Sequence, residues 1–131
     1  MTLPYEERNS IVQYRLGKAI ETLKEVHAVA ALGFWSLAAN RLYYAAYYAS
    51  VALLINKEIE TSTHKGALRM IQLFVKDGVL KMEDSRLLGR LFSMRQTGDY
   101  GDMFDWEEDD IIPLIPKVEE YIQRISKLLE N

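Results

Sequence analysis

Residues 34–56, "FWSLAANRLYYAAYYASVALLIN", contain a single charged side chain, that of Arg41. A helix over this stretch would be apolar on nearly every side, and such a helix is normally surrounded by neighbours. Six alanines, at positions 38, 39, 45, 46, 49 and 52, would let those neighbours approach closely. The stretch therefore predicts a helix from about Trp35 to Asn56 in the middle of a helical bundle.

The same stretch is long enough to cross a membrane. Asn40 and Arg41 lie well inside it, however, and four tyrosines lie near its middle. A central arginine costs about 2.5–3.5 kcal/mol on membrane-insertion scales. The sequence thus favours a buried bundle helix over a membrane span.

The first and last helices are predicted from apolar residues that recur every three or four positions. The first helix runs from about Glu7 to Ala30, and the last begins near Leu114 because Pro113 and Pro116 fit only in or before its first turn. Acidic residues at 107–110 precede that start, where the helix dipole favours negative charge. The apolar positions are Val12, Leu16, Ala19, Leu23, Val26 and Ala30 in the first helix, and Ile115, Val118, Ile122, Ile125 and Leu129 in the last.

Two further helices lie between these elements. Ser62 or Thr63 is the expected N-cap of a helix that extends to about Lys76. Another runs from about Glu83 to Thr97, with Gly98 as its expected C-terminal stop. No segment alternates like a strand. The sequence therefore predicts one all-α domain over residues 1–131, an up-and-down helical bundle of four long helices and a shorter one.

The net charge of −3 is unevenly distributed. Residues 99–110, "DYGDMFDWEEDD", hold seven acidic residues and no basic one, while the remaining residues hold twelve acidic against sixteen basic residues, a net charge of +4. A mildly basic body with one acidic loop permits a polyanionic partner away from that loop.

The chain contains no cysteine, which excludes disulfides and thiolate metal sites and fits a reducing compartment. No basic-then-apolar leader opens the sequence, so a cytoplasmic location is expected. Motifs for phosphate loops, dinucleotides and zinc proteases are missing. His27 and His64, the two histidines, have no histidine partner nearby in sequence. We therefore expect neither a metal site nor a cofactor.

Arg41, Tyr44 and Tyr48 fall on one face of the central helix. In a structural interpretation, Arg41 is a buried arginine held by a carboxylate or backbone group, and the tyrosines fill the core. In a functional interpretation, the three side chains line a polar cleft between helices. The residues alone leave both open.

Arg95 follows Leu88 and Leu91 on the apolar stripe of its helix, so its side chain should point inward. In a structural interpretation, Arg95 forms a compensating salt bridge with Asp99 at the end of the helix. In a functional interpretation it belongs to an anion site, because the guanidinium is suited to phosphate and Tyr100 could stack on a base. We expect Arg41 to be largely buried and paired with a carboxylate, Asp99 being the first candidate.

Three segments together resemble the HEPN superfamily, and specifically the small stand-alone HEPN proteins found beside minimal nucleotidyltransferases in prokaryotes. The segments are "NRLYYAAYYASVALLI", "THKGALRMIQLFVKDGVL" and "LLGRLFSMRQTGDY". The family pattern falls on Arg41 to Ala49 with Tyr43 and Tyr44, on His64-Lys65-Gly66, and on Arg95 with Asp99-Tyr100. The resemblance spans nearly the whole chain, most clearly residues 35–100, and implies a helical bundle.

Members of this family commonly dimerise, and many are metal-independent ribonucleases that serve as toxins. Their site is an arginine followed four to six residues later by histidine, and two copies meet across the dimer. Here Tyr100 stands five residues after Arg95, and no histidine follows. Tyrosine, with a usual pKa near 10, is a poor general base compared with histidine. The resemblance therefore implies phosphate binding at Arg95 and puts cleavage in doubt.

The resulting hypothesis is a HEPN protein that binds nucleotide or RNA and acts with a nucleotidyltransferase partner in a toxin–antitoxin-type module. An active ribonuclease toxin and a dimeric scaffold without ligand are the alternatives. Arg95 and Tyr100 are the candidate catalytic residues. The candidate ligand-binding residues are Arg41, Tyr44, Tyr48, His64, Lys65 and Asp99. We also expect a homodimer, on the resemblance and on aromatic residues near the acidic loop, including Phe104 and Trp106.

Overall fold

Helix α2 (Trp35–Asn56) is the central element of the molecule, as its sequence predicts. A computed structural model describes residues 3–100 and 105–130, with residues 98–100 described by their backbone alone. In the described residues α2 contacts every other α-helix of the chain. The others are α1 (Tyr5–Ala31), α3 (His64–Lys76), α4 (Met82–Tyr100), α5 (Glu108–Ile111) and α6 (Ile115–Leu128).

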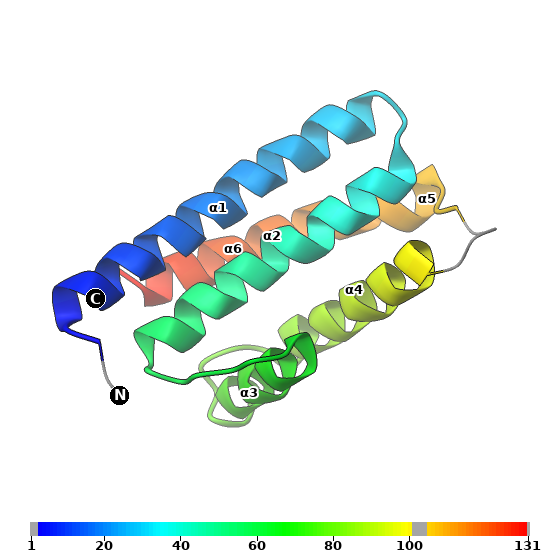
Figure 1. The fold of residues 1–131 in the computed structure, drawn as a ribbon. Helices are drawn as coiled ribbons and strands as arrows, with labels where there is room; N and C mark the ends of the chain where they lie inside the picture. The colour runs from blue at the N-terminus through cyan, green and yellow to red at the C-terminus, as the bar shows by residue number, and fades with distance from the viewer. Residues whose placement is uncertain (1–2, 101–104, 131) are drawn as a thin grey trace.

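The long helices α1 and α2 form an antiparallel hairpin, with α6 packed against both and with α3 and α4 along the other side of α2 (Figure 1). Gly33 in the turn of this hairpin has φ of +78°, a conformation that glycine adopts without strain. The described residues contain helices and no strand, so the all-α prediction is confirmed. None of the described helices is long and apolar enough to span a membrane.

Close packing around α2 depends on its small side chains. Its six alanines at positions 38, 39, 45, 46, 49 and 52 are all buried. Ser50 is buried too, and its hydroxyl lies 2.8 Å from the Ala46 carbonyl and 2.5 Å from the hydroxyl of Tyr121 on α6. Both buried hydroxyls are therefore satisfied, and they tie α6 to the middle of α2.

The predicted helix ends are partly confirmed. Thr63 is the N-cap of α3, and its Oγ1 accepts a hydrogen bond from the Gly66 N–H at 2.9 Å. Pro113 lies in a 3₁₀ turn, Ile112–Leu114, and α6 begins directly after it. The prediction for Gly98 was wrong, since α4 continues to Tyr100. One glycine costs a helix about 1 kcal/mol, which packing of the preceding turns can offset.

The acidic residues before the last helix form an element of their own. Glu108, Asp109 and Asp110 lie in the short helix α5, which the sequence interpretation had merged into the approach to α6. Glu107 and Asp110 form a reciprocal capping box at the start of α5, in which the Glu107 N–H donates to Asp110 at 3.0 Å. The negative charge is thus placed at a helix N-terminus, where the dipole favours it.

Candidate functional site

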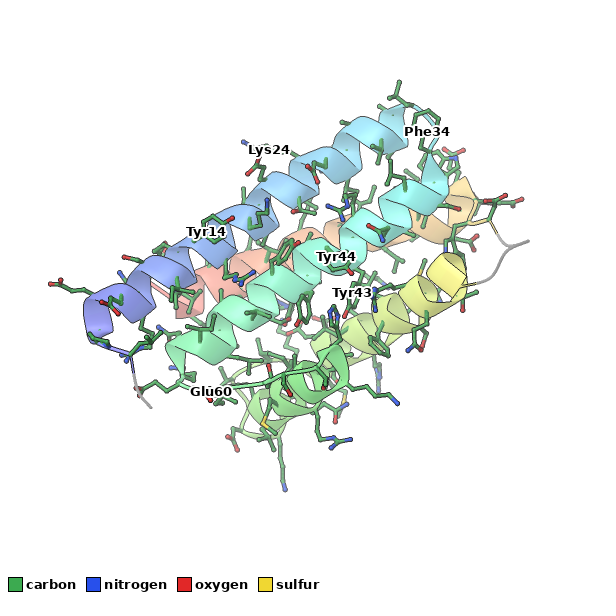
Figure 2. The ribbon with its side chains drawn as sticks, viewed as in Figure 1. Tyr14, Lys24, Phe34, Tyr43, Tyr44 and Glu60 are labelled. Atoms are coloured by element: carbon green, nitrogen blue, oxygen red, sulfur yellow. The ribbon has the colours of Figure 1, made fainter. Side chains whose placement is uncertain are left out.

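A row of four tyrosines on α2 forms the base of the candidate site. Tyr43 is fully buried, while Tyr44, Tyr47 and Tyr48 are half-buried. The rings of Tyr43 and Tyr47 are stacked with centroids 5.8 Å apart, and those of Tyr44 and Tyr48 are 5.9 Å apart. Both pairs are four residues apart, the spacing that brings side chains together on a helix. Figure 2 shows Tyr43 and Tyr44 on the middle turns of α2.

His64 is the first residue of α3 and packs directly on these tyrosines. Its ring lies parallel to that of Tyr47, with centroids 4.2 Å apart and planes inclined by 3°. Its Nδ1 lies 2.5 Å from the hydroxyl of Tyr43, at hydrogen-bond distance. His64 therefore contacts α2 through the rings of Tyr43, Tyr44 and Tyr47 and through the hydrogen bond with Tyr43.

The local sequence Thr63-His64-Lys65-Gly66 explains how His64 is placed. The Thr63 cap starts α3 at His64, so the histidine projects from the first turn. A Cβ on Gly66 would meet Thr63 Oγ1 at 3.0 Å, a distance too short for most side chains to accept. Glycine at this position therefore permits the tight cap that orients the first turn.

Arg95 reaches the same tyrosines from α4. Its guanidinium carbon lies 5.4 Å from the ring centre of Tyr43 and 5.6 Å from that of Tyr44. Both distances are within the range of a cation–π interaction. The inward orientation predicted from the apolar stripe is confirmed, since Leu91 and Met94 on the same helix are buried.

His64 and Arg95 are electrostatically coupled through this arrangement. Partial burial of His64 lowers the pKa of its imidazole below the usual 6.5, and the positive charge of Arg95 lowers it further. Burial raises the pKa of Tyr43 far above its usual value of 10, an effect that Arg95 only partly opposes. At neutral pH the centre therefore combines a neutral imidazole, a protonated phenol and a permanent cation.

Arg41 also approaches Tyr44, with its guanidinium carbon 5.3 Å from that ring centre. It is partly exposed, and its carboxylate partner is Glu25 on α1, with Nη1 and Oε1 3.3 Å apart. It also donates to the Asn40 side chain at 2.9 and 3.1 Å. Arg41 is thus paired with a carboxylate, as predicted, and the partner that the structure describes is Glu25. The side chain of Asp99, the first candidate, lies outside the described residues. Two guanidinium groups, those of Arg41 and Arg95, therefore lie near the ring of Tyr44.

The other predicted site residues are distributed around this centre. Tyr48 packs beside Tyr44 and Tyr47, with its ring centre 6.3 Å from that of Tyr47. Lys65 is exposed on the first turn of α3. Asp99 and Tyr100 form the end of α4, but their side chains lie outside the described residues, as does Phe104. Across the described residues no group of three or more histidines and carboxylates could hold a metal ion.

Two residues of the centre were missing from the sequence-based set. Tyr43 belonged to the family pattern but was not assigned to the site, and Tyr47 was not considered. The four-residue spacing between them was a usable signal for a stacked pair on one face. The contact of either ring with His64 was not predictable from spacing, because it depends on how α3 packs across α2.

The family model for the HEPN domain matches residues 12–128 of the chain. The chain belongs to the HEPN family. The matched region includes all of α2, α3 and α4, and therefore the whole centre formed by Tyr43, His64 and Arg95. The resemblance inferred from the sequence is thereby confirmed.

Curated relatives match most of the chain. A "UPF0332 protein" of Thermotoga maritima is 34% identical over 95% of this chain and 96% of its own length. A "UPF0332 protein" of Archaeoglobus fulgidus is 24% identical over 92% and 96%, respectively. A protein of Methanocaldococcus jannaschii named "Putative toxin MJ0142" is 30% identical over 73% of this chain and 66% of its own length.

Proposed function

We propose that this HEPN protein is a toxin-type protein that binds RNA or nucleotide phosphate at the centre formed by Tyr43, His64 and Arg95. The observation that carries the proposal is that His64 and Arg95, from different helices, meet on the ring of Tyr43. The name of the Methanocaldococcus jannaschii relative supports the toxin-type role. RNA as the target is also consistent with a cytoplasmic location, which forms part of this proposal.

The chemistry of the centre suits an anion with an attached base. A guanidinium offers several N–H donors in a planar fork that matches phosphate oxygens. The tyrosine row and the imidazole of His64 offer ring faces on which an unpaired base can stack. The acidic stretch of Asp105 and residues 107–110 disfavours long polyanions on that side, so a short or single-stranded ligand fits better than a long duplex.

A second candidate function, ribonuclease activity, is favoured by the position of His64. Tyr100 occupies the place of the histidine in the family motif, but His64 supplies an imidazole that contacts the same two tyrosines as Arg95. A neutral imidazole can accept a proton at pH 7. This requires Nδ1–H to donate to the Tyr43 hydroxyl, so that Nε2 is the unprotonated nitrogen.

Incubation of the protein with labelled single-stranded RNA in EDTA separates the two candidates. We expect the wild type to bind the RNA and to leave it largely intact, because the motif histidine is absent. Arg95→Ala and His64→Gln variants serve as matched comparisons. Rapid cleavage that both variants lose would replace the binding proposal with the ribonuclease, whereas absence of binding by all three would favour a scaffold.

We further propose that the protein forms a homodimer and acts with a nucleotidyltransferase partner, as the sequence resemblance implies. Trp106, one of the aromatic residues that motivated this expectation, is half-buried against the core, and its backbone N–H donates to Ser36 Oγ at 3.0 Å. Light scattering is expected to give about twice the 15.2 kDa of one chain. A monomer at high micromolar concentration would contradict the dimer. A nucleotidyltransferase reading frame beside the gene would support the partner, and its absence would count against it.

A further inference from the structure

A groove of about 710 Å³ begins beside the candidate centre and runs away from it. Its walls are the N-terminal half of α1 and the C-terminal half of α2, and the chain that connects α2 to α3 closes one end. Glu60, labelled in Figure 2, lies on this connection. Tyr47 belongs to both places, because it lines the groove and also stacks on the ring of His64. Tyr47 therefore links the groove to the centre formed by Tyr43, His64 and Arg95.

Two arginines of α1 line the groove and differ in their environment. Arg8 is engaged within the protein, since its Nη1 lies 3.1 Å from Glu58 Oε1. Arg15 is half-buried and makes no hydrogen bond or ion pair with any residue that the structure describes. Its Nε is buried without an acceptor. A buried donor without a partner is costly, so a site of this kind commonly awaits an external acceptor.

Arg15 and Tyr47 line the same groove, so the arginine is connected to the centre through this ring. Burial raises the pKa of the Tyr47 phenol, and the charge of Arg15 is the largest opposing influence. Tyr47 thus stacks on the imidazole of His64 and lines the groove that contains the cation of Arg15. A nucleic acid strand presents phosphates at regular intervals with bases between them, which matches two cations separated by an aromatic ring.

We infer that the groove binds single-stranded RNA beyond the phosphate held at Arg95, with Arg15 contacting a neighbouring phosphate and Tyr47 lying beneath the intervening nucleotide. This inference rests on the proposed function and extends it to the class of ligand. A mononucleotide fills only the centre, whereas an oligonucleotide also reaches Arg15. Arg8 neutralises Glu58, which leaves Arg15 and Glu60 as the other two charged residues of the lining.

The test compares uridine monophosphate with a 2′-O-methylated penta-uridylate, which cannot be cleaved through its 2′-oxygen. Arg15→Gln is expected to weaken binding of the pentamer about tenfold, the contribution of one charge-assisted contact. Binding of the monophosphate should not change. The plot of log affinity for the pentamer against log salt concentration should become less steep, by the amount that about one phosphate contact contributes. Arg86→Gln, at an exposed arginine of α4, removes the same charge and should change neither affinity.

The outcomes distinguish this inference from the proposed function. One outcome is that Arg95→Ala binds neither ligand while Arg15→Gln binds the pentamer as the wild type does. This outcome overturns RNA binding in the groove but supports phosphate binding at the centre. Unchanged binding of both ligands by Arg95→Ala overturns the proposed function itself. Arg15→Lys keeps the charge and should bind the pentamer within about threefold of the wild type. A loss as large as that of Arg15→Gln would assign the effect to packing and reject the inference.

Discussion

Replacement of Arg95 by alanine is expected to lower the affinity for single-stranded RNA by about 10- to 100-fold. The guanidinium is the permanent cation on Tyr43 and Tyr44, so the variant removes the principal phosphate contact of the proposed site. Hydrogen bonds to charged groups contribute about 1.5–3 kcal/mol, which corresponds to that range of affinity. Fluorescence anisotropy with a labelled oligonucleotide at one fixed salt concentration measures the change.

Arg90→Ala is the matched control for this experiment, because Arg90 is an exposed arginine on the same helix. It should reduce the affinity by less than threefold through general charge alone. Arg95→Lys should fall between the wild type and the alanine variant, since lysine keeps the charge but loses the planar fork. Equal losses for Arg90→Ala and Arg95→Ala would indicate nonspecific attraction and contradict a site at Arg95.

The Tyr43→Ala variant is expected to show the largest loss of stability, about 3–5 kcal/mol in the free energy of unfolding. Tyr43 is a fully buried ring of the central helix, with 1% of its surface exposed, and it packs on Tyr47, His64 and Phe92. Tyr43→Phe keeps the ring and removes the hydroxyl that faces His64 Nδ1, so its cost should be about 1 kcal/mol. Urea unfolding followed by circular dichroism gives both values.

Tyr14→Ala provides the comparison, because this tyrosine of α1 is 62% exposed. Its replacement should change the free energy of unfolding by less than about 0.5 kcal/mol. A cost for Tyr43→Ala as small as that of Tyr14→Ala would contradict the packing described for α2. A cost for Tyr43→Phe as large as that for Tyr43→Ala would assign the stability to the hydrogen bond with His64 instead of the ring.

The central position of α2 was predictable because a helix that is buried on all sides is apolar on all sides. This pattern is visible in the sequence of that helix alone. The Thr63 cap and the start of α6 were predictable for a similar reason, since capping residues and prolines act within one turn. The inward direction of Arg95 followed from its register with Leu88 and Leu91. Each of these inferences used residues no more than a few turns apart.

The contacts between helices were not predictable in the same way. A carboxylate partner was expected for Arg41, but no spacing within α2 indicated that Glu25 would provide one across the α1–α2 hairpin. The contact of His64 with Tyr43 joins residues 21 positions apart and depends on the path of the connection before α3. Such pairings are set by the packing of whole helices, about which the spacing of residues within one helix carries little information.

The central claim, that Arg95 and His64 form one phosphate-binding centre, is tested most directly by the pKa of His64 measured by NMR. His27→Gln removes the other histidine, which lies on α1 and pairs with Glu119 at 2.7 Å, so a single imidazole is observed. Without RNA, the pKa of His64 is expected below 6.5, because burial and Arg95 both disfavour the charged form. Bound 2′-O-methylated RNA should raise this pKa, since a phosphate beside the ring favours imidazolium. An unchanged pKa at saturating RNA would contradict the claim.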